Sequence, residues 1–289
     1  MSGPGLVLVS GATGQQGGAV AEELLDAGWA VRAMTRHPES DKGRALASRG
    51  AEVVRADLDD EASLRQALEG VWGALAVQNT WEAGVEQEEA QGKRFARVAK
   101  EAGVQHLVYQ SVGSAHRQTG IPHFDNKWRV EETIRALGFP SFVVMRPVYF
   151  MENLLSPWVK PYLDQDTLAI GMKPETRLQM IAVSDIGTYG LRAFERHEAV
   201  NGRAFDLAGD ELTGPEMAEV LSDVTGRTIN FYSVPIEDVR KGSEEFAVML
   251  EWFDRVGYNA DIQTTAAELD VQPTRFREWA DRQDWSPAQ

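Results

Sequence analysis

Short apolar runs alternate with longer stretches of helical periodicity through the first half of the chain, and this alternation is the strongest constraint on its fold. The runs expected to form strands are "GLVLVS", "AVRAMT", "AEVVRA", "GALAV", "HLVYQS" and "SFVVMR". Between them, helices are expected over residues 15–28, 61–69, 83–102 and 122–137. Strands that alternate with helices, and that are apolar enough to be covered on both faces, build a parallel sheet through right-handed crossovers. The predicted fold class is therefore α/β with a doubly wound parallel sheet.

After Arg146 this alternation becomes irregular. We expect two further strands at "LQMIAV" and "RAFDLAG", a capped helix at "GPEMAEVLSDVTG", and short helices over residues 244–285. We assign residues 1–150 to the sheet domain, with later strands around 178–234 returning to it. Residues 151–289 form a smaller C-terminal α+β lobe in this interpretation, with no linker rich in proline, glycine or serine before it.

The composition excludes several functions. The 289 residues include 29 basic and 44 acidic ones, and the net charge of −15 argues against direct binding of nucleic acid or anionic membranes. There is no cysteine, which excludes disulfides and thiolate chemistry. The five histidines show no metal-binding spacing, and no nucleophile elbow or P-loop motif occurs. Because "MSGPGLVLVSGATG" is neither a signal peptide nor a membrane span, we expect a cytoplasmic protein.

The stretch "LVLVSGATGQQGGAVAEELLDAG" carries the strongest chemical signal. Gly11, Gly14 and Gly17 lie between an expected strand and an expected helix, where backbone N–H groups and the helix N-terminus can approach a pyrophosphate. The first interval of this GxxGxxG pattern is one residue wider than in the common dinucleotide fingerprint. The pattern predicts a dinucleotide site, and the alternative is a tight strand–helix turn without a ligand.

The residue after the second strand indicates which dinucleotide is bound. Arg36 lies nineteen residues after Gly17, and no acidic residue stands beside it at the strand end. An arginine there accommodates the 2′-phosphate of NADP, whereas an acidic residue would bind the ribose hydroxyl of NAD. We therefore expect NADP(H) to be preferred over NAD(H), with Lys42 or Arg44 assisting; the alternative is a solvated surface arginine. Asp57, after the third strand, is expected either near the adenine or at an acidic helix start.

Several motifs occur in a fixed order: "GATGQQGG", "TRHP", "AEVVRADLDD", "VQNTWE", "HFDNKWRVEETIRALG" and "RPVYFMENLL". Together they resemble the NmrA-like branch of the atypical short-chain dehydrogenase/reductase superfamily, including its redox-sensor members, over nearly the whole chain. The resemblance implies a Rossmann domain that binds NADP(H) and a small lobe that closes a cleft over the nicotinamide. The cofactor-binding residues expected on this basis are Gly11, Thr13, Gly14, Gln15, Gln16, Gly17, Arg36, Asp57, Leu58, Gln78, Asn79, Lys127, Pro147, Tyr149 and Asn153.

Reductases of this superfamily use a tyrosine as proton donor, a lysine four residues later, and a serine after the fifth strand. Lys127 matches the lysine and Ser111 the serine, but His123 stands at the tyrosine position. A histidine, with an ordinary pKa of about 6.5, can also donate a proton. Tyr149 is a second candidate. Each has a structural alternative: a surface position for His123, lobe packing for Tyr149, and a turn hydroxyl for Ser111.

Two functional classes follow from the resemblance. In the first, the protein is an NADP(H) sensor or regulator that acts on a protein partner, and Lys127 binds the ribose without catalysis. In the second, it is an NAD(P)H-dependent reductase of a quinone or another small carbonyl or enone, with Lys127 or His123 moving the proton. The missing tyrosine favours the sensor. A homodimer is also considered, since Trp252, Trp279 and Trp285 are expected either in the lobe core or at a dimer contact.

Overall fold

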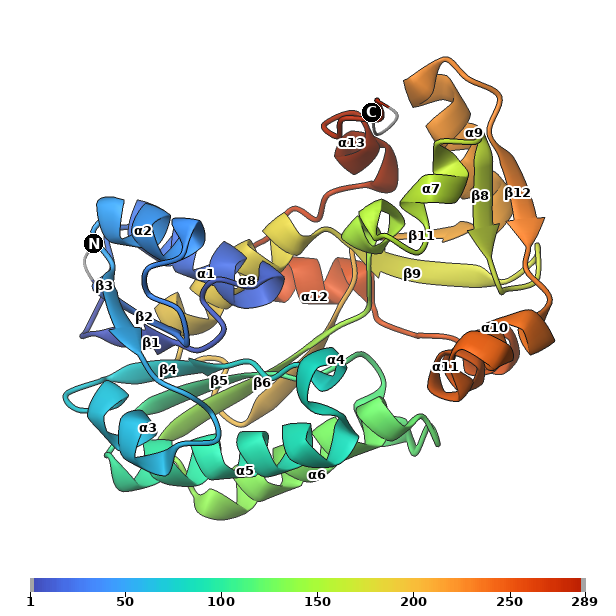
Figure 1. The fold of residues 1–289 in the computed structure, drawn as a ribbon. Coiled ribbons are helices and arrows are strands. Elements are labelled where there is room, and N and C mark those ends of the chain that lie inside the picture. Colours follow the sequence, from blue (N-terminus) through green and yellow to red (C-terminus); the bar gives the residue numbers. More distant parts are fainter. Residues whose placement is uncertain (1–2, 287–289) are drawn as a thin grey trace.

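The computed structural model describes residues 3–286 and is built around a seven-stranded parallel sheet (Figure 1). Its strand order is β10-β6-β5-β4-β1-β2-β3, which confirms the predicted doubly wound class. The chain winds outward in one direction from β1 and in the other from β4, so the order reverses between these two neighbours. The strands are β1 (Val7–Val9), β2 (Val31–Thr35), β3 (Glu52–Arg55), β4 (Gly73–Ala76), β5 (His106–Gln110), β6 (Ser141–Pro147) and β10 (Arg203–Leu207).

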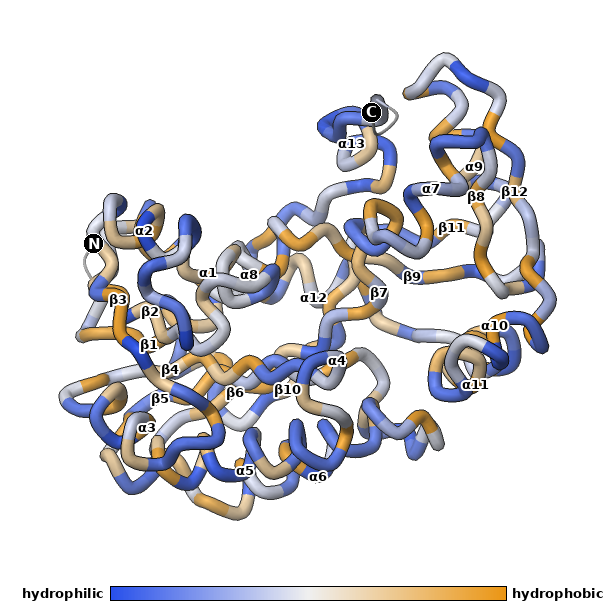
Figure 2. Tube along the Cα trace, in the orientation of Figure 1, coloured by the Kyte–Doolittle hydropathy of each residue, from blue (hydrophilic) through white to orange (hydrophobic). Residues whose placement is uncertain are grey.

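Helices cover both faces of this sheet (Figure 1). Alternate residues of β1 serve the two faces: Val7 and Val9 join one hydrophobic cluster, and Leu8 joins another. Burial on both faces explains why the strands are continuous apolar runs, and Figure 2 shows the central strands as largely hydrophobic. One face carries α1 (Gln15–Asp26), α2 (Asp41–Ser48) and α8 (Val183–Glu195), and the other carries α3 (Glu61–Ala67), α5 (Val85–Glu101) and α6 (Pro122–Leu137).

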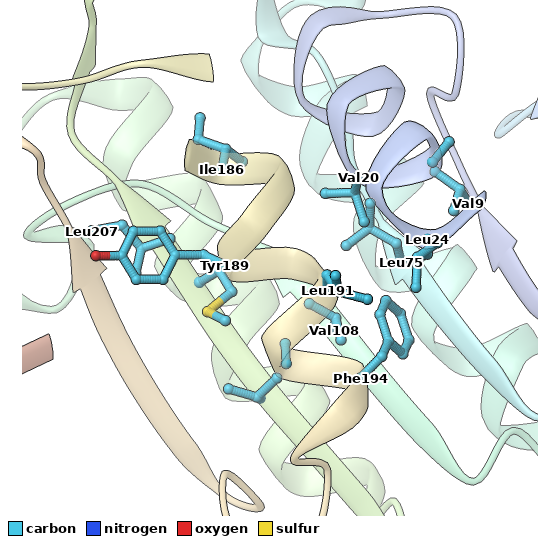
Figure 3. Packing of buried hydrophobic residues seen from close by; sticks show 14 of the residues in the cluster. Val9, Val20, Leu24, Leu75, Val108, Ile186, Tyr189, Leu191, Phe194 and Leu207 are labelled. Atoms are coloured by element: carbon cyan, nitrogen blue, oxygen red, sulfur yellow. The ribbon is translucent and has the colours of Figure 1, made fainter. Parts of the chain in front are cut away.

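Helix α8 was not predicted from the sequence, because its internal glycines lower helix propensity by about 1 kcal/mol each. The structure gives these glycines a packing role. A Cβ atom on Gly190 would lie 2.5 Å from a methyl group of Val20 in α1. Figure 3 shows Val20 and Leu24 of α1 beside Leu191 and Phe194 of α8. The tertiary contact with α1 therefore outweighs the weak local preference.

The C-terminal lobe contains two small sheets. Strand β9 pairs with β7 in parallel and with β11 in antiparallel orientation, and β8 pairs with β12 in parallel. The strands are β7 (Tyr149–Phe150), β8 (Thr167–Ile170), β9 (Arg177–Ile181), β11 (Asp210–Thr213) and β12 (Asn230–Ser233). The remaining helices are α4 (Thr80–Ala83), η1 (Ala115–Arg117), η2 (Met151–Leu155), α7 (Lys160–Leu163), α9 (Gly214–Thr225), α10 (Ile236–Gly242), α11 (Glu244–Arg255), α12 (Ile262–Leu269) and α13 (Phe276–Ala280).

One expectation about these elements is corrected. Of the strands expected around 178–234 to return to the main sheet, only β10 does so, because β9, β11 and β12 find partners within the lobe. The helix expected over 83–102 is confirmed as α5, and Gly84, whose φ of +81° is a left-handed conformation, separates it from the short helix α4.

Among residues 3–286, no helix is both long and apolar enough to cross a membrane. The same part of the chain contains no group of three or more histidine and acidic side chains placed to hold a metal ion.

Candidate functional site

The glycine-rich turn joins β1 to α1 at the point where the strand order reverses. Gly11 has a φ of +60°, which allows the tight turn. A Cβ atom on Gly17 would lie 2.4 Å from the carbonyl oxygen of Gly11, so this glycine permits close packing of α1 on the turn. Gly14 is exposed, and no side chain caps the helix that it begins. The turn therefore presents a positive helix end at an open surface, which is a favourable environment for an anion.

Basic side chains border this turn. Lys42 in α2 donates a hydrogen bond to the carbonyl oxygen of Thr13 at 3.1 Å. Arg36, directly after β2, is exposed, and its Nη2 atom lies 2.6 Å from a carboxylate oxygen of Glu82 in α4. Arg44 instead pairs within α2. Lys42 thus contacts the turn, and Arg36 follows Thr35, whose hydroxyl lies 3.4 Å from that of Thr13 in the turn. Arg36 itself is joined to α4 by an ion pair that sequence reasoning missed.

Several expected cofactor residues have local structural contacts. The carboxylate of Asp57 accepts a hydrogen bond from a backbone N–H two residues later, at 3.0 Å. The carbonyl oxygen of Leu58 accepts one from Arg94 at 2.6 Å. Asn79 caps α4 through a hydrogen bond from the N–H of Trp81, at 3.1 Å. The side chains of Asp57 and Asn79 therefore stabilise the start of a turn and of a helix.

The glutamines of the expected site have free hydrogen-bonding capacity. Gln15 is exposed at the start of α1, and the side-chain oxygen of Gln16 is buried without a protein partner. Gln78, just beyond β4, is 5% exposed, and neither atom of its amide group has a partner. Buried amide groups normally form hydrogen bonds. A ligand or water at the end of β4 would satisfy Gln78.

Lys127 is held by a buried carboxylate that sequence reasoning did not identify. Its Nζ atom lies 2.5 Å from Oε1 of Glu88, a residue of α5 that is 2% exposed. Asn126 donates to the other carboxylate oxygen at 2.8 Å, and the hydroxyl of Thr80 also donates to it. Burial pushes the pKa of Glu88 upward, but the Lys127 ammonium and the hydrogen bonds outweigh burial and hold this pKa below its usual value. Glu88 is therefore the counter-ion of Lys127.

His123 is not a surface residue, because it is only 7% exposed. Its Nδ1 atom lies 2.6 Å from a carboxylate oxygen of Glu245 in α11, which connects α6 to the lobe. Its ring lies beside Trp81 and Phe124, with centroid separations of 5.3 and 4.9 Å. Burial lowers the pKa of His123, although Glu245 opposes this effect. At neutral pH, His123 is therefore mainly an uncharged imidazole.

The hydroxyl of Ser111 donates to a carboxylate oxygen of Glu131 at 2.6 Å. Glu131 is fully buried and also binds Arg146, with a contact of 2.6 Å. Arg146 in turn contacts Nδ1 of His116 at 2.9 Å. Ser111 thus belongs to a buried ionic network between β6 and α6, and its hydroxyl proton is engaged there.

Tyr149 lies in β7 and packs in the lobe, with its ring 6.5 Å from that of Phe253. Burial raises the pKa of Tyr149 to about 12, although the side chain of Asn153 partly opposes the increase. Tyr149 is therefore a weak acid inside a hydrophobic core and stays protonated at neutral pH.

Pro147 is also buried, and its carbonyl oxygen accepts a hydrogen bond from the N–H of Gly113 at 2.8 Å. Three tryptophans were expected either in the lobe core or at a dimer contact, and they are buried in the lobe core: Trp252, Trp279 and Trp285.

Residues 4–280 match the model of the NmrA-like family. The chain belongs to the NmrA-like family. A relative from Streptomyces griseus, a (4-alkanoyl-5-oxo-2,5-dihydrofuran-3-yl)methyl phosphate reductase, is 31% identical over 95% of this chain and 96% of its own. The NmrA-like family domain-containing oxidoreductase FrzB of Cladobotryum sp is 36% identical over 54% of this chain, and the match spans only 50% of FrzB.

A solved structure shares the fold of this NmrA-like protein. The NADPH-dependent quinone oxidoreductase QOR2 from Escherichia coli, in complex with NADPH, has a TM-score of 0.82 at 24% identity. The similarity covers 95% of this chain and 98% of QOR2.

Two cavities of this chain, of about 350 and 340 Å³, are lined by none of the residues expected to bind a cofactor. The candidate site is thus the exposed glycine turn and the strand ends beside it.

Proposed function

We propose that this NmrA-like protein binds NADP(H) and uses it to reduce small conjugated carbonyl compounds, namely quinones or enones. Three features support the cofactor: the exposed turn at Gly14, the unpartnered amide of Gln78 at the end of β4, and the cationic Arg36 after β2. In this proposal the turn and α1 hold the pyrophosphate, Arg36 holds the 2′-phosphate, and Lys127 holds the nicotinamide ribose. The bound cofactor supplies a hydride.

The observation that carries the proposed reaction is that the candidate proton donors are either engaged or weakly acidic. The Ser111 hydroxyl donates to Glu131, His123 faces Glu245, and burial raises the pKa of Tyr149 to about 12. Reduction of an isolated ketone needs a proton at the developing alkoxide. A conjugated acceptor spreads the negative charge after the hydride adds to it, and water can then supply the proton. The S. griseus relative, named as a reductase of an unsaturated lactone, supports this substrate class.

The test is NADPH oxidation, followed by absorbance, with a quinone, an enone and a saturated ketone. We expect turnover of the conjugated acceptors, slow or absent reduction of the ketone, and a rate within about threefold of the parent in His123→Ala. If His123 were the proton donor, its protonated form would be required. The rate would then fall as pH rises through its pKa, which burial places below 6.5. A loss of roughly 100-fold in His123→Ala would contradict the proposal.

A second candidate function, an NADP(H) sensor, is favoured by the ion pair between Arg36 and Glu82. If Arg36 binds the 2′-phosphate, the phosphate competes with Glu82 for the same guanidinium group. Glu82 adjoins Trp81, whose ring lies 6.2 Å from that of Phe246 in α11. Binding of NADP would thus change the contacts of α4. A regulatory protein partner that binds α4 would detect this change. Tight NADP binding without turnover of any acceptor would favour this function.

The competition at Arg36 gives a separate prediction. Arg36→Ala should weaken NADP binding by roughly tenfold, because a charge-assisted contact with the 2′-phosphate is lost. Glu82→Gln should strengthen NADP binding by about twofold to fivefold, since an exposed ion pair is weak but no longer competes. Neither change should alter NAD affinity. Calorimetric titration with both nucleotides measures these effects, and equal losses for NAD and NADP in Arg36→Ala would show that Arg36 does not recognise the 2′-phosphate.

A further inference from the structure

Trp81 is an exposed aromatic residue at the edge of the candidate site. The residue is 63% exposed, although its ring contacts His123 of α6 and Phe246 of α11, with centroid separations of 5.3 and 6.2 Å. Trp81 therefore lies where the sheet domain meets the lobe. Its ring packs against His123, the residue at the proton-donor position of the superfamily. The exposed part of the indole leaves surface on which a planar ligand can pack.

The helix that carries Trp81 is anchored at its N-terminal end. Asn79 caps this end at 3.1 Å, and Thr80 donates to the buried Glu88. Thr80 and Lys127 share Glu88 as a partner, so the position of α4 is coupled to that of the lysine expected at the nicotinamide ribose. These contacts thus fix the backbone that carries the indole, close to the expected reaction centre.

We propose that Trp81 is the specificity-determining side chain of this site, on which a flat, electron-poor aromatic acceptor stacks. This inference rests on the proposed reductase function and narrows its substrate class to quinones in preference to aliphatic enones. The electron-rich face of an indole favours an offset-stacked planar ring, and an aliphatic enone offers no comparable face. A quinone on Trp81 would lie beside His123, which shares one face of α6 with Lys127.

Binding can be tested without turnover by titrating 1,4-naphthoquinone into the protein saturated with oxidised NADP. We expect Trp81→Ala to lower the affinity for the quinone by about threefold to tenfold, which is the effect of losing one aromatic pair. Trp81→Phe should retain most of the affinity. Trp158→Ala is the matched control, because Trp158 is 83% exposed and lies in the connection between η2 and α7. It should leave the affinity for the quinone unchanged.

Kinetics provide the second arm of the test. In Trp81→Ala, kcat/KM for 1,4-naphthoquinone should fall by about the same factor as the affinity, while kcat/KM for cyclohexenone should stay unchanged. If no acceptor is reduced, the proposed function fails, yet the titration still decides whether Trp81 binds a planar ring. The inference is overturned if naphthoquinone binds Trp81→Ala as tightly as it binds the parent protein. It is overturned as well if naphthoquinone binds neither protein. It is also overturned if Trp158→Ala has the same effect, or if Trp81→Ala weakens NADP rather than the quinone.

Discussion

Gly14→Val is expected to remove NADP(H) binding while lowering the free energy of unfolding only modestly. Gly14 is exposed, and the one atom outside its neighbours near a Cβ at this position is the carbonyl oxygen of Gly11, at 3.2 Å. This distance is shorter than an ordinary Cβ contact, so the turn must shift by a few tenths of an ångström to accept a valine. The valine side chain then occupies the space where we expect the pyrophosphate to approach the backbone. The expected loss of affinity is roughly 100-fold or more. Calorimetric titration and thermal unfolding with added NADP measure the two quantities.

Gly17→Ala is the matched control for this prediction. A Cβ atom there would lie 2.4 Å from the carbonyl oxygen of Gly11 and 2.6 Å from that of Ser10, so α1 would have to move. We expect a destabilisation of about 1–3 kcal/mol together with weaker binding. If NADP stabilises Gly14→Val against heat as much as it stabilises the parent, the glycine turn is not the nucleotide site.

Lys127→Met is expected to lower the free energy of unfolding by about 3–5 kcal/mol at neutral pH, because it leaves the charge of Glu88 buried without its counter-ion. In the parent, the folded-state pKa of Glu88 lies below its unfolded value. Glu88 therefore adds stability above the unfolded pKa, and this stability is lost as pH falls through the folded pKa. In the variant, burial without Lys127 raises the folded pKa, so the charged carboxylate destabilises the protein until it is protonated.

The stability difference between parent and Lys127→Met should therefore be larger near pH 8 than near pH 4. Denaturant unfolding at both pH values measures it. The double variant Glu88→Gln/Lys127→Met removes the unpaired charge and should recover much of the loss, which a double-mutant cycle quantifies. A pH-independent loss that Glu88→Gln does not reduce would show that Lys127 acts through packing rather than as the counter-ion of Glu88.

The elements of the first half of the chain could be predicted because their signals are local. The apolar runs of β1 and β4 predict strands that are buried on both faces, and the structure places both in the middle of the sheet. The turn at Gly11 was equally readable, since a tight strand–helix connection depends on residues close in the chain. Family membership also followed from ordered motifs, and the match over residues 4–280 confirms it.

The chemical state of the site was decided by tertiary structure alone. Lys127 meets Glu88 across 39 residues, and His123 meets Glu245 across 122, because the sheet order brings α5 to α6 and the lobe brings α11 to it. No periodicity or motif encodes such contacts, since a carboxylate looks the same in the sequence whether it is solvated or paired in a core. For residues 3–286, the local sequence pattern thus determines the fold class and the glycine turn. Burial and long-range pairing determine which of their polar groups are free to react.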